Sequence, residues 1–136
     1  MERLLIVVAL VAVALLVARL IERRRPDAPT QPQWSVPSQL DRADFDRPAA
    51  PWLVAVFTSA TCLSCAKARA DAAVLDSEQV VVQEVELAVR ADLHRRYAID
   101  AVPTIVVADA DGVVRASFLG PPTATDLWAA VAEVRG

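Results

Sequence analysis

The chain has 136 residues, which leaves room for one domain of ordinary size, and 55% of its residues are hydrophobic. The first 25 residues carry five Arg and two Glu, a net charge of +3, and the remaining 111 residues carry a net charge of −6. An acidic domain lacks the basic surface that binds phosphates, so the charge argues against a nucleic-acid-binding protein.

The chain begins with a long apolar segment. Residues 4–18 form an uninterrupted apolar run, which extends to eighteen positions at residue 21 if the Arg19 side chain reaches toward the membrane surface. Eighteen helical residues span roughly 27 Å, about the thickness of a hydrocarbon core. We therefore expect residues 1–25 to be a single-pass anchor in the cell membrane, with a basic flank. A cleaved signal peptide and a buried or peripheral helix are the alternatives.

The flanking charges and the next segment predict how the chain continues. Arg3 and the amino terminus precede the apolar run, whereas four arginines follow it by residue 25. This asymmetry favours a cytoplasmic location for the rest of the chain, with an extracytoplasmic one as the alternative. Residues 26–37 contain four prolines and predict an extended linker. The remaining residues, 38–136, form the predicted globular domain.

The globular domain alternates strand and helix patterns. A short polar stretch, 38–48, predicts a turn or short helix, and Ser59 or Thr61 is available to cap the first long helix. Asp111–Gly112 marks a hairpin turn, and Thr123 with Asp126 resembles a weakened capping box. The predicted elements, in order, are a strand at 52–57, a helix at 59–77, a strand at 80–87, a helix at 88–97, strands at 104–109 and 113–118, and a helix at 123–134.

This order predicts an α/β domain with three layers. The first strand, helix and strand form a βαβ unit, which gives parallel strands, whereas the last two strands form an antiparallel hairpin. The result is a mixed sheet of about four strands with helices on both faces.

Cys62 and Cys65 are the only cysteines, and they lie where the first strand passes into the first long helix. A helix N-terminus favours the reactive thiolate, and this spacing allows a small disulfide ring. Cys62 would then be the exposed nucleophile and Cys65 the resolving cysteine. A metal site needs about four ligands, but the chain has one histidine, His94, which we expect on a solvated face. Two small core residues, or a relic of a lost site, are the structural alternative.

A further feature is the proline of Val102-Pro103-Thr104, which opens the third strand. A proline there is unfavourable unless a special turn is needed, and a cis peptide bond is one such arrangement.

Together these segments resemble the thioredoxin superfamily over residues 50–136. The similarity rests on the apolar strand WLVAVF, on Cys62-Leu63-Ser64-Cys65, on residues 97–104, and on the turn 109–112 with Gly120. The resemblance implies a thioredoxin-like fold and thiol–disulfide exchange, with Cys62 attacking and Cys65 resolving. It also implies a cis Pro103 beside the disulfide and substrate binding by Thr61, Val102, Pro103 and Thr104.

The same resemblance implies what accompanies the reaction. The redox-active disulfide needs no cofactor and no metal, and the partners are protein thiols or disulfides with a separate redox partner. We expect the domain to be monomeric.

Several positions differ from the family pattern. Thr61 replaces the usual tryptophan, and Leu63-Ser64 replaces Gly-Pro. This dipeptide tunes the redox potential in the family, so both reduction and oxidation of partners stay open. Val56 stands where the family has a buried acid, and Glu84 stands where it has a lysine, so Glu84 is a possible proton acceptor. The sequence thus predicts a membrane-tethered thiol–disulfide oxidoreductase. The alternative is a non-catalytic thioredoxin-like module that docks a protein at the membrane.

Overall fold

The computed structural model describes residues 1–23 and 35–136. The chain divides into two units, Met1–Gln33 and Trp34–Gly136. The linker expected at 26–37 lies outside the described residues except for its last three positions.

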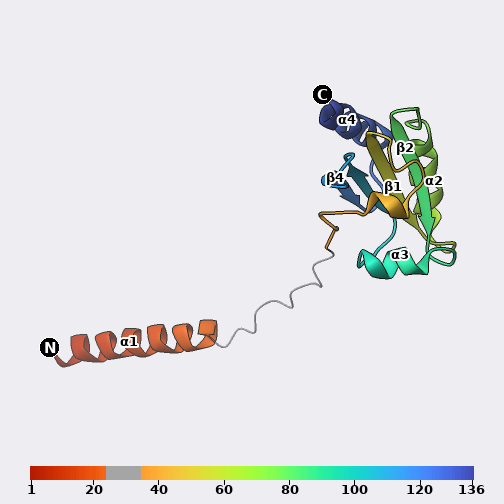
Figure 1. The fold of residues 1–136 in the computed structure, drawn as a ribbon. Helices are drawn as coiled ribbons and strands as arrows, with labels where there is room; N and C mark the ends of the chain where they lie inside the picture. Colours follow the sequence, from red (N-terminus) through yellow and green to blue (C-terminus); the bar gives the residue numbers. More distant parts are fainter. Residues whose placement is uncertain (24–34) are drawn as a thin grey trace. The chain divides into compact units, whose positions relative to one another are not determined.

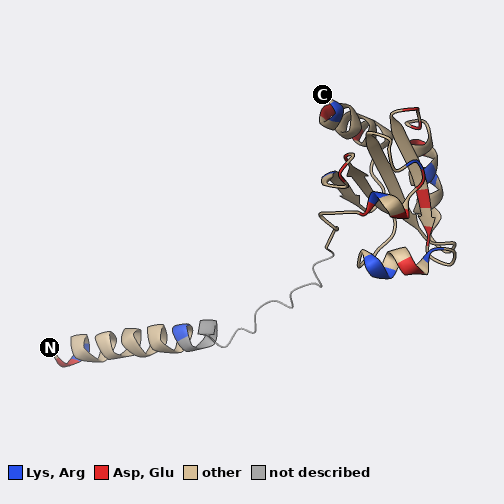
Figure 2. Cartoon of the chain, in the orientation of Figure 1, with Lys and Arg blue, Asp and Glu red and all other residues tan. Residues whose placement is uncertain are grey.

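The described residues of the first unit form helix α1 (Glu2–Arg23). Figure 2 shows the described part of α1 uncharged along most of its length, with charged residues near both of its ends. The apolar run between Arg3 and Arg19 has fifteen residues, residues 4–18. Such a run spans about 22 Å, which is shorter than a hydrocarbon core of about 30 Å. No helix in the described part of the chain combines the length and the apolar character needed to span a bilayer. The structure therefore does not support the transmembrane anchor expected for residues 1–25.

The second unit is built around a four-stranded mixed sheet in the order β2-β1-β3-β4 (Figure 1). Strand β1 runs parallel to β2 and antiparallel to β3, and β3 runs antiparallel to β4. This confirms the predicted mixed sheet, with its parallel βαβ unit and final hairpin. The elements in order are η1 (Arg42–Asp44), β1 (Trp52–Thr58), α2 (Leu63–Ala73), β2 (Val80–Glu86), α3 (Ala91–Arg96), β3 (Thr104–Ala108), β4 (Val114–Leu119) and α4 (Ala124–Arg135).

Each face of the sheet has its own apolar core. On one face, Val56 and Ile105 pack with Ala68 of α2 and Leu127 of α4. On the other face, the core joins sheet residues such as Phe57 to residues of the segment before β1 and of α3, namely Leu40, Phe45, Leu93 and Tyr97. Strand β1 contributes to both cores, which explains why its sequence is apolar at almost every position. The domain therefore has the three layers that the sequence predicts.

The segment before β1 closes the α3 side of the domain. Gln39 forms a β-bridge with Val113, and the Leu40 amide donates to the Gly112 carbonyl oxygen over 2.8 Å. The Asp41 amide donates to the Tyr97 hydroxyl over 3.0 Å. This segment therefore fastens the hairpin turn and α3 to the sheet.

His94 is not on a solvated face, in contrast to the sequence expectation. Its side chain is buried, and Nε2 donates to the carbonyl oxygen of Val85 over 2.8 Å. The ring also meets Phe57 edge-on, with centroids 5.3 Å apart. Because α3 has only six residues, the single face that it turns to the sheet includes His94, while the two arginines that follow stay exposed.

Candidate active site

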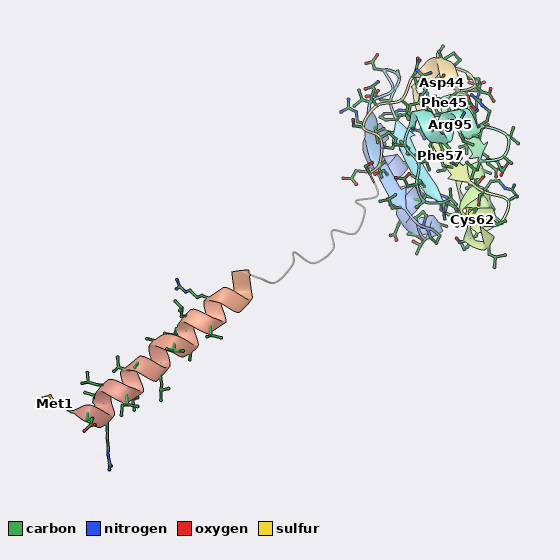
Figure 3. The ribbon with its side chains drawn as sticks, turned by 90° about the horizontal axis from the view of Figure 1, so that it is seen from below. Met1, Asp44, Phe45, Phe57, Cys62 and Arg95 are labelled. Carbon is green, nitrogen blue, oxygen red and sulfur yellow. A yellow bond between two sulfur atoms is a disulfide. The ribbon has the colours of Figure 1, made fainter. Side chains whose placement is uncertain are left out.

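The two cysteines lie at the start of α2, immediately after the central strand β1. A tight turn follows β1, in which the Cys62 amide donates to the Ser59 carbonyl oxygen over 3.2 Å. Cys62 and Cys65 form a disulfide, with their Cα atoms 5.4 Å apart. Cys62 is half-buried, whereas Cys65 is only 3% exposed. Cys62 is thus the more accessible residue of the two, and Figure 3 shows it at the edge of the domain, away from Asp44 and Phe45.

Helix α2 begins later than predicted, with Cys62 itself as the N-cap residue and no side-chain capping bond. The turn over residues 59–62 holds Ser59 and Thr61 outside the helix, so neither caps it as expected. The positive end of the helix therefore faces the cysteine pair without a capping side chain, an arrangement that favours a thiolate once the disulfide is reduced.

A cavity of about 450 Å³ opens beside the disulfide. The turn at 59–60 forms part of its wall. The other lining residues come from α2 and β2, and they are Cys62, Cys65, Ala66, Arg69, Glu84 and Glu86. The cavity brings together both predicted cysteines and the predicted acid, Glu84.

Both carboxylate oxygens of Glu84 accept hydrogen bonds. The Thr58 hydroxyl at the end of β1 donates to Oε1 over 2.8 Å. The Arg69 guanidinium on α2 donates to Oε2 over 3.2 Å. The Glu84 side chain is 31% exposed, so it lies at the rim of the cavity and not in the core.

Glu84 is the acid that lies next to the cysteines at this level of the sheet, because the neighbouring strand β1 has no acidic residue. Val56 is paired in register with Glu84 and is fully buried, and β1 contains no ionisable side chain. The second acid of the cavity, Glu86, accepts hydrogen bonds from the amides of Ala88 and Val89. Glu86 therefore closes the turn after β2, while the Glu84 carboxylate is bonded to Thr58 and Arg69.

The loop before β3 lies at the same end of the sheet as the disulfide. The Val102–Pro103 peptide bond is cis, as the family resemblance implied. Thr104, the first residue of β3, is paired in register with Phe57 near the end of β1, the strand that leads to Cys62. Thr104 is buried and its hydroxyl donates to the Ala101 carbonyl oxygen over 2.8 Å.

The predicted substrate-binding residues do not line the cavity. Thr61 is exposed, Val102 is half-buried and Pro103 is buried. They belong to the two loops at this end of the sheet, and the cavity wall is made by other residues.

Two residues of the site, Thr58 and Arg69, were missed by sequence reasoning. A signal for Arg69 is present in the spacing, because Cys62, Cys65 and Arg69 recur at intervals of three and four residues, which places them on one helix face. Thr58 carries no comparable signal, because its partner Glu84 is on another strand.

A second hollow, of about 460 Å³, lies beside Tyr97 and Arg96 on the α3 side. Its cations are already engaged. Arg96 pairs with Asp41 and Asp44, and Arg42 donates to the carbonyl oxygens of Ala50 and Asp109. In residues 1–23 and 35–136, no group of three His, Cys, Asp or Glu side chains is placed to hold a metal ion. The cysteine cavity is therefore the better candidate for chemistry.

Comparison with known proteins identifies the architecture. No protein-family model matches the chain, and a search of curated proteins finds no match either. Solved structures are similar. The germline-specific thioredoxin Deadhead of Drosophila melanogaster is 22% identical, with a TM-score of 0.56, over 63% of this chain and 83% of that one. The thioredoxin of Fasciola hepatica is 22% identical, with a TM-score of 0.55 and the same coverage of both chains.

The oxidised form of mitochondrial thioredoxin 3 from Saccharomyces cerevisiae is 19% identical, with a TM-score of 0.52, over 62% of this chain and 79% of that one. The chain thus has a thioredoxin-like fold and carries a Cys62–Cys65 disulfide within it. At this level of identity the likeness establishes the fold alone.

Proposed function

We propose that the protein is a thiol–disulfide oxidoreductase that uses Cys62 and Cys65 on partner proteins. The observation that carries the proposal is the disulfide at the start of α2, with Cys62 half-buried, Cys65 buried and a carboxylate in the same cavity. A disulfide held only for stability would not need an accessible sulfur or a neighbouring acid.

The reaction can be written as two thiol–disulfide exchanges. In the reduced protein, the Cys62 thiolate attacks one sulfur of a partner disulfide, which forms a mixed disulfide and releases the other partner sulfur as a thiolate. Cys65 then attacks the Cys62 sulfur and releases the second partner sulfur. Two electrons pass from the protein dithiol to the partner disulfide, and the Cys62–Cys65 bond of the present structure is formed. The reverse sequence transfers the disulfide to a partner dithiol.

Cys65 must lose a proton before it can attack, and we assign Glu84 as the acceptor. Cys65 is buried. Strand β1 supplies no acid near it, because Val56 stands where the family has its buried acid. Glu84 lines the same cavity, and its carboxylate accepts hydrogen bonds from Thr58 and from Arg69 of the cysteine-bearing helix. Thus the carboxylate on β2 takes the place of an acid on β1.

Partner binding falls to the loops around the disulfide. The exposed Thr61, the backbone of Val102 and the ring of Pro103 are the proposed contacts with an extended partner segment. The Thr104 hydroxyl donates a hydrogen bond to the Ala101 carbonyl oxygen. We therefore assign Thr104 to holding this loop in place and not to contact with the partner. The exchange requires no cofactor, and a separate thiol or disulfide partner restores the starting state.

The test uses a Cys65→Ser variant, which can form the mixed disulfide but cannot resolve it. We expect the variant to trap partner proteins through Cys62, as bands on non-reducing gels that disappear with reductant, and the wild type to reduce insulin disulfides. The matched control, Cys62→Ser, should trap nothing. If the wild type reduces no disulfide, oxidises no dithiol and Cys65→Ser traps no partner, the proposal is wrong and a non-catalytic docking module is favoured.

A further inference from the structure

We propose that Arg69 is a positioning residue that, together with Thr58, holds the Glu84 carboxylate beside the cysteine pair. This inference rests on the proposed function and adds to it the part of the site that places the proton acceptor. Arg69 lies one helical turn beyond Cys65 on α2, on the face that lines the cavity.

Glu84 needs such support because of its place in the fold. Strand β2 is the last strand of the sheet on its side, and the Glu84 side chain is 31% exposed. A glutamate side chain at such an edge has several rotamers open to it, most of which carry the carboxylate into solvent. A proton acceptor works only within hydrogen-bonding reach of the donor or of one bridging water. An unsupported Glu84 would therefore spend little time in the productive position.

The two donors that hold Glu84 come from the two elements that also hold the cysteines. Thr58 is the last residue of β1, and the turn after it leads to Cys62. Its hydroxyl donates a hydrogen bond to Oε1 of Glu84 over 2.8 Å. Arg69 belongs to the same helix as Cys65, and its guanidinium donates a hydrogen bond to Oε2 of Glu84 over 3.2 Å. The carboxylate is thereby fixed to the same framework as the sulfur atoms.

The other charged groups nearby are engaged elsewhere. Lys67, the other cation of α2 near the cysteines, pairs with Asp71 one turn further along the helix. The Glu86 carboxylate accepts hydrogen bonds from the backbone amides of the turn after β2. Among the described residues, Arg69 is the cation that is hydrogen-bonded to Glu84.

The consequence is specific to the resolving step. Without Arg69, Thr58 alone holds the carboxylate, and we expect the attack by Cys65 to slow about 10-fold at pH 7, against about 100-fold for removal of the acceptor itself. Toward pH 10, hydroxide in the solvent can take the thiol proton in place of Glu84. The difference between the variants and the wild type should therefore disappear there.

The experiment measures each step with reduced protein and the aromatic disulfide dithiobis(nitrobenzoate). The first nitrothiobenzoate released reports the attack by Cys62, and the second reports resolution by Cys65. Both rates are followed from pH 6 to pH 10 for the wild type and the variants Arg69→Met, Thr58→Val and Glu84→Gln. Lys67→Met serves as the matched control because it removes a cation from the same helix that does not contact Glu84.

We expect Arg69→Met and Thr58→Val to slow only the second release at neutral pH, with wild-type rates restored at pH 10, and Arg69→Lys to recover part of the loss. Lys67→Met should behave as the wild type. In the background of Glu84→Gln, Arg69→Met should add less than 2-fold, since Arg69 acts through Glu84.

Two outcomes would overturn the inference while the proposed function stands. One is an Arg69→Met variant that is folded and resolves at the wild-type rate across the pH range. The other is a full additional 10-fold loss in the Glu84→Gln background, which would mean that Arg69 acts without Glu84. A wild-type protein that releases no second nitrothiobenzoate refutes the proposed function itself, which separates the two failures.

Discussion

The amide nitrogen of Gly120 lies 2.8 Å from the carbonyl oxygen of Pro103 and donates a hydrogen bond to it. This hydrogen bond joins the end of β4 to the loop before β3, at the same end of the sheet as the disulfide. Gly120 has a φ of +84°, a conformation that residues with a Cβ atom rarely adopt. The glycine therefore allows the chain to turn while its amide secures the loop.

Gly120 and Gly112 provide a matched pair for a first prediction. Their φ values are +84° and +80°, so alanine is strained at both positions. A Cβ atom at residue 120 has no neighbour within 4 Å, whereas at residue 112 it would lie 1.9 Å from the Leu40 carbonyl oxygen. We expect Gly120→Ala to lower the free energy of unfolding by about 1–2 kcal/mol, the cost of the backbone conformation. Gly112→Ala should cost about 3 kcal/mol or more, because Leu40 must move.

Urea unfolding of the two variants measures this difference directly. Equal losses would show that the segment at Leu40 yields easily and does not fasten the hairpin turn.

Tyr97 predicts an alkaline limit to stability. Burial, followed by the hydrogen bond to Asp44, raises the pKa of Tyr97 to about 12 from an ordinary value of 10.0. A raised pKa favours the neutral phenol in the folded state, so its contribution is complete below pH 10 and is lost as the pH rises toward about 12. Tyr97→Phe removes the hydroxyl between Asp44 and the Asp41 amide and should cost about 1–2 kcal/mol at pH 7. The stability curves of the wild type and the variant should converge between pH 10 and pH 12, and parallel curves would contradict the prediction.

Asp109 predicts an acid limit of the opposite sign. Burial disfavours its charged form, but hydrogen bonds from Arg115 and from the amides of Val113 and Asp111 outweigh burial and lower the pKa of Asp109. Its contribution is therefore present above the ordinary value of about 4 and is lost as the pH falls through the lowered folded-state pKa. Asp109→Asn should cost about 1 kcal/mol at pH 7, since the ion pair with the half-exposed Arg115 is lost. Unfolding at pH 7 and at pH 2.5 checks this, and a loss that persists in acid would rule out the carboxylate charge as its cause.

Local patterns in the sequence predict the strands but not the exact ends of helices. The apolar run at 52–57 reports burial on both faces, and β1 is indeed buried on both. The start of α2 depends on the turn that closes between Ser59 and Cys62, so the cap predicted from residue types was wrong. His94 shows the same limit, since two neighbouring arginines suggest a solvated face, while the packing of a one-sided short helix decides its burial.

The candidate site was predictable only in part for a related reason. The cysteine pair is a local motif, and its position where a buried strand passes into a helix indicates a redox pair. The hold on Glu84 depends on the register of β2 beside β1 and on the helix lying over them, which brings Thr58 and Arg69 to one carboxylate. The spacing places Arg69 on the same helix face as the cysteines, but no local pattern connects Arg69 or Thr58 with Glu84, so these contacts had to come from the structure.

Leu63 leads to a last prediction, about the choice of partner. It lies between the two cysteines and is 96% exposed, so its side chain contributes almost nothing to the core. An apolar side chain at this position gains free energy when a partner covers it, by about 1–2 kcal/mol, which corresponds to roughly 5- to 30-fold in affinity. We therefore expect Leu63→Ser to lower kcat/KM for reduction of a protein disulfide such as that of insulin within this range. Reaction with the small dithiobis(nitrobenzoate) and the free energy of unfolding should stay the same.

The matched control is Val74→Ser, which removes another exposed apolar side chain at the far end of α2, with 67% exposure. It should leave kcat/KM for insulin unchanged, because a partner that reaches Cys62 does not need to cover the opposite end of an 11-residue helix. A common loss in both variants would point to general apolar adhesion. A loss in Leu63→Ser that extends equally to the small disulfide would mean that Leu63 tunes the cysteines themselves and does not select the partner.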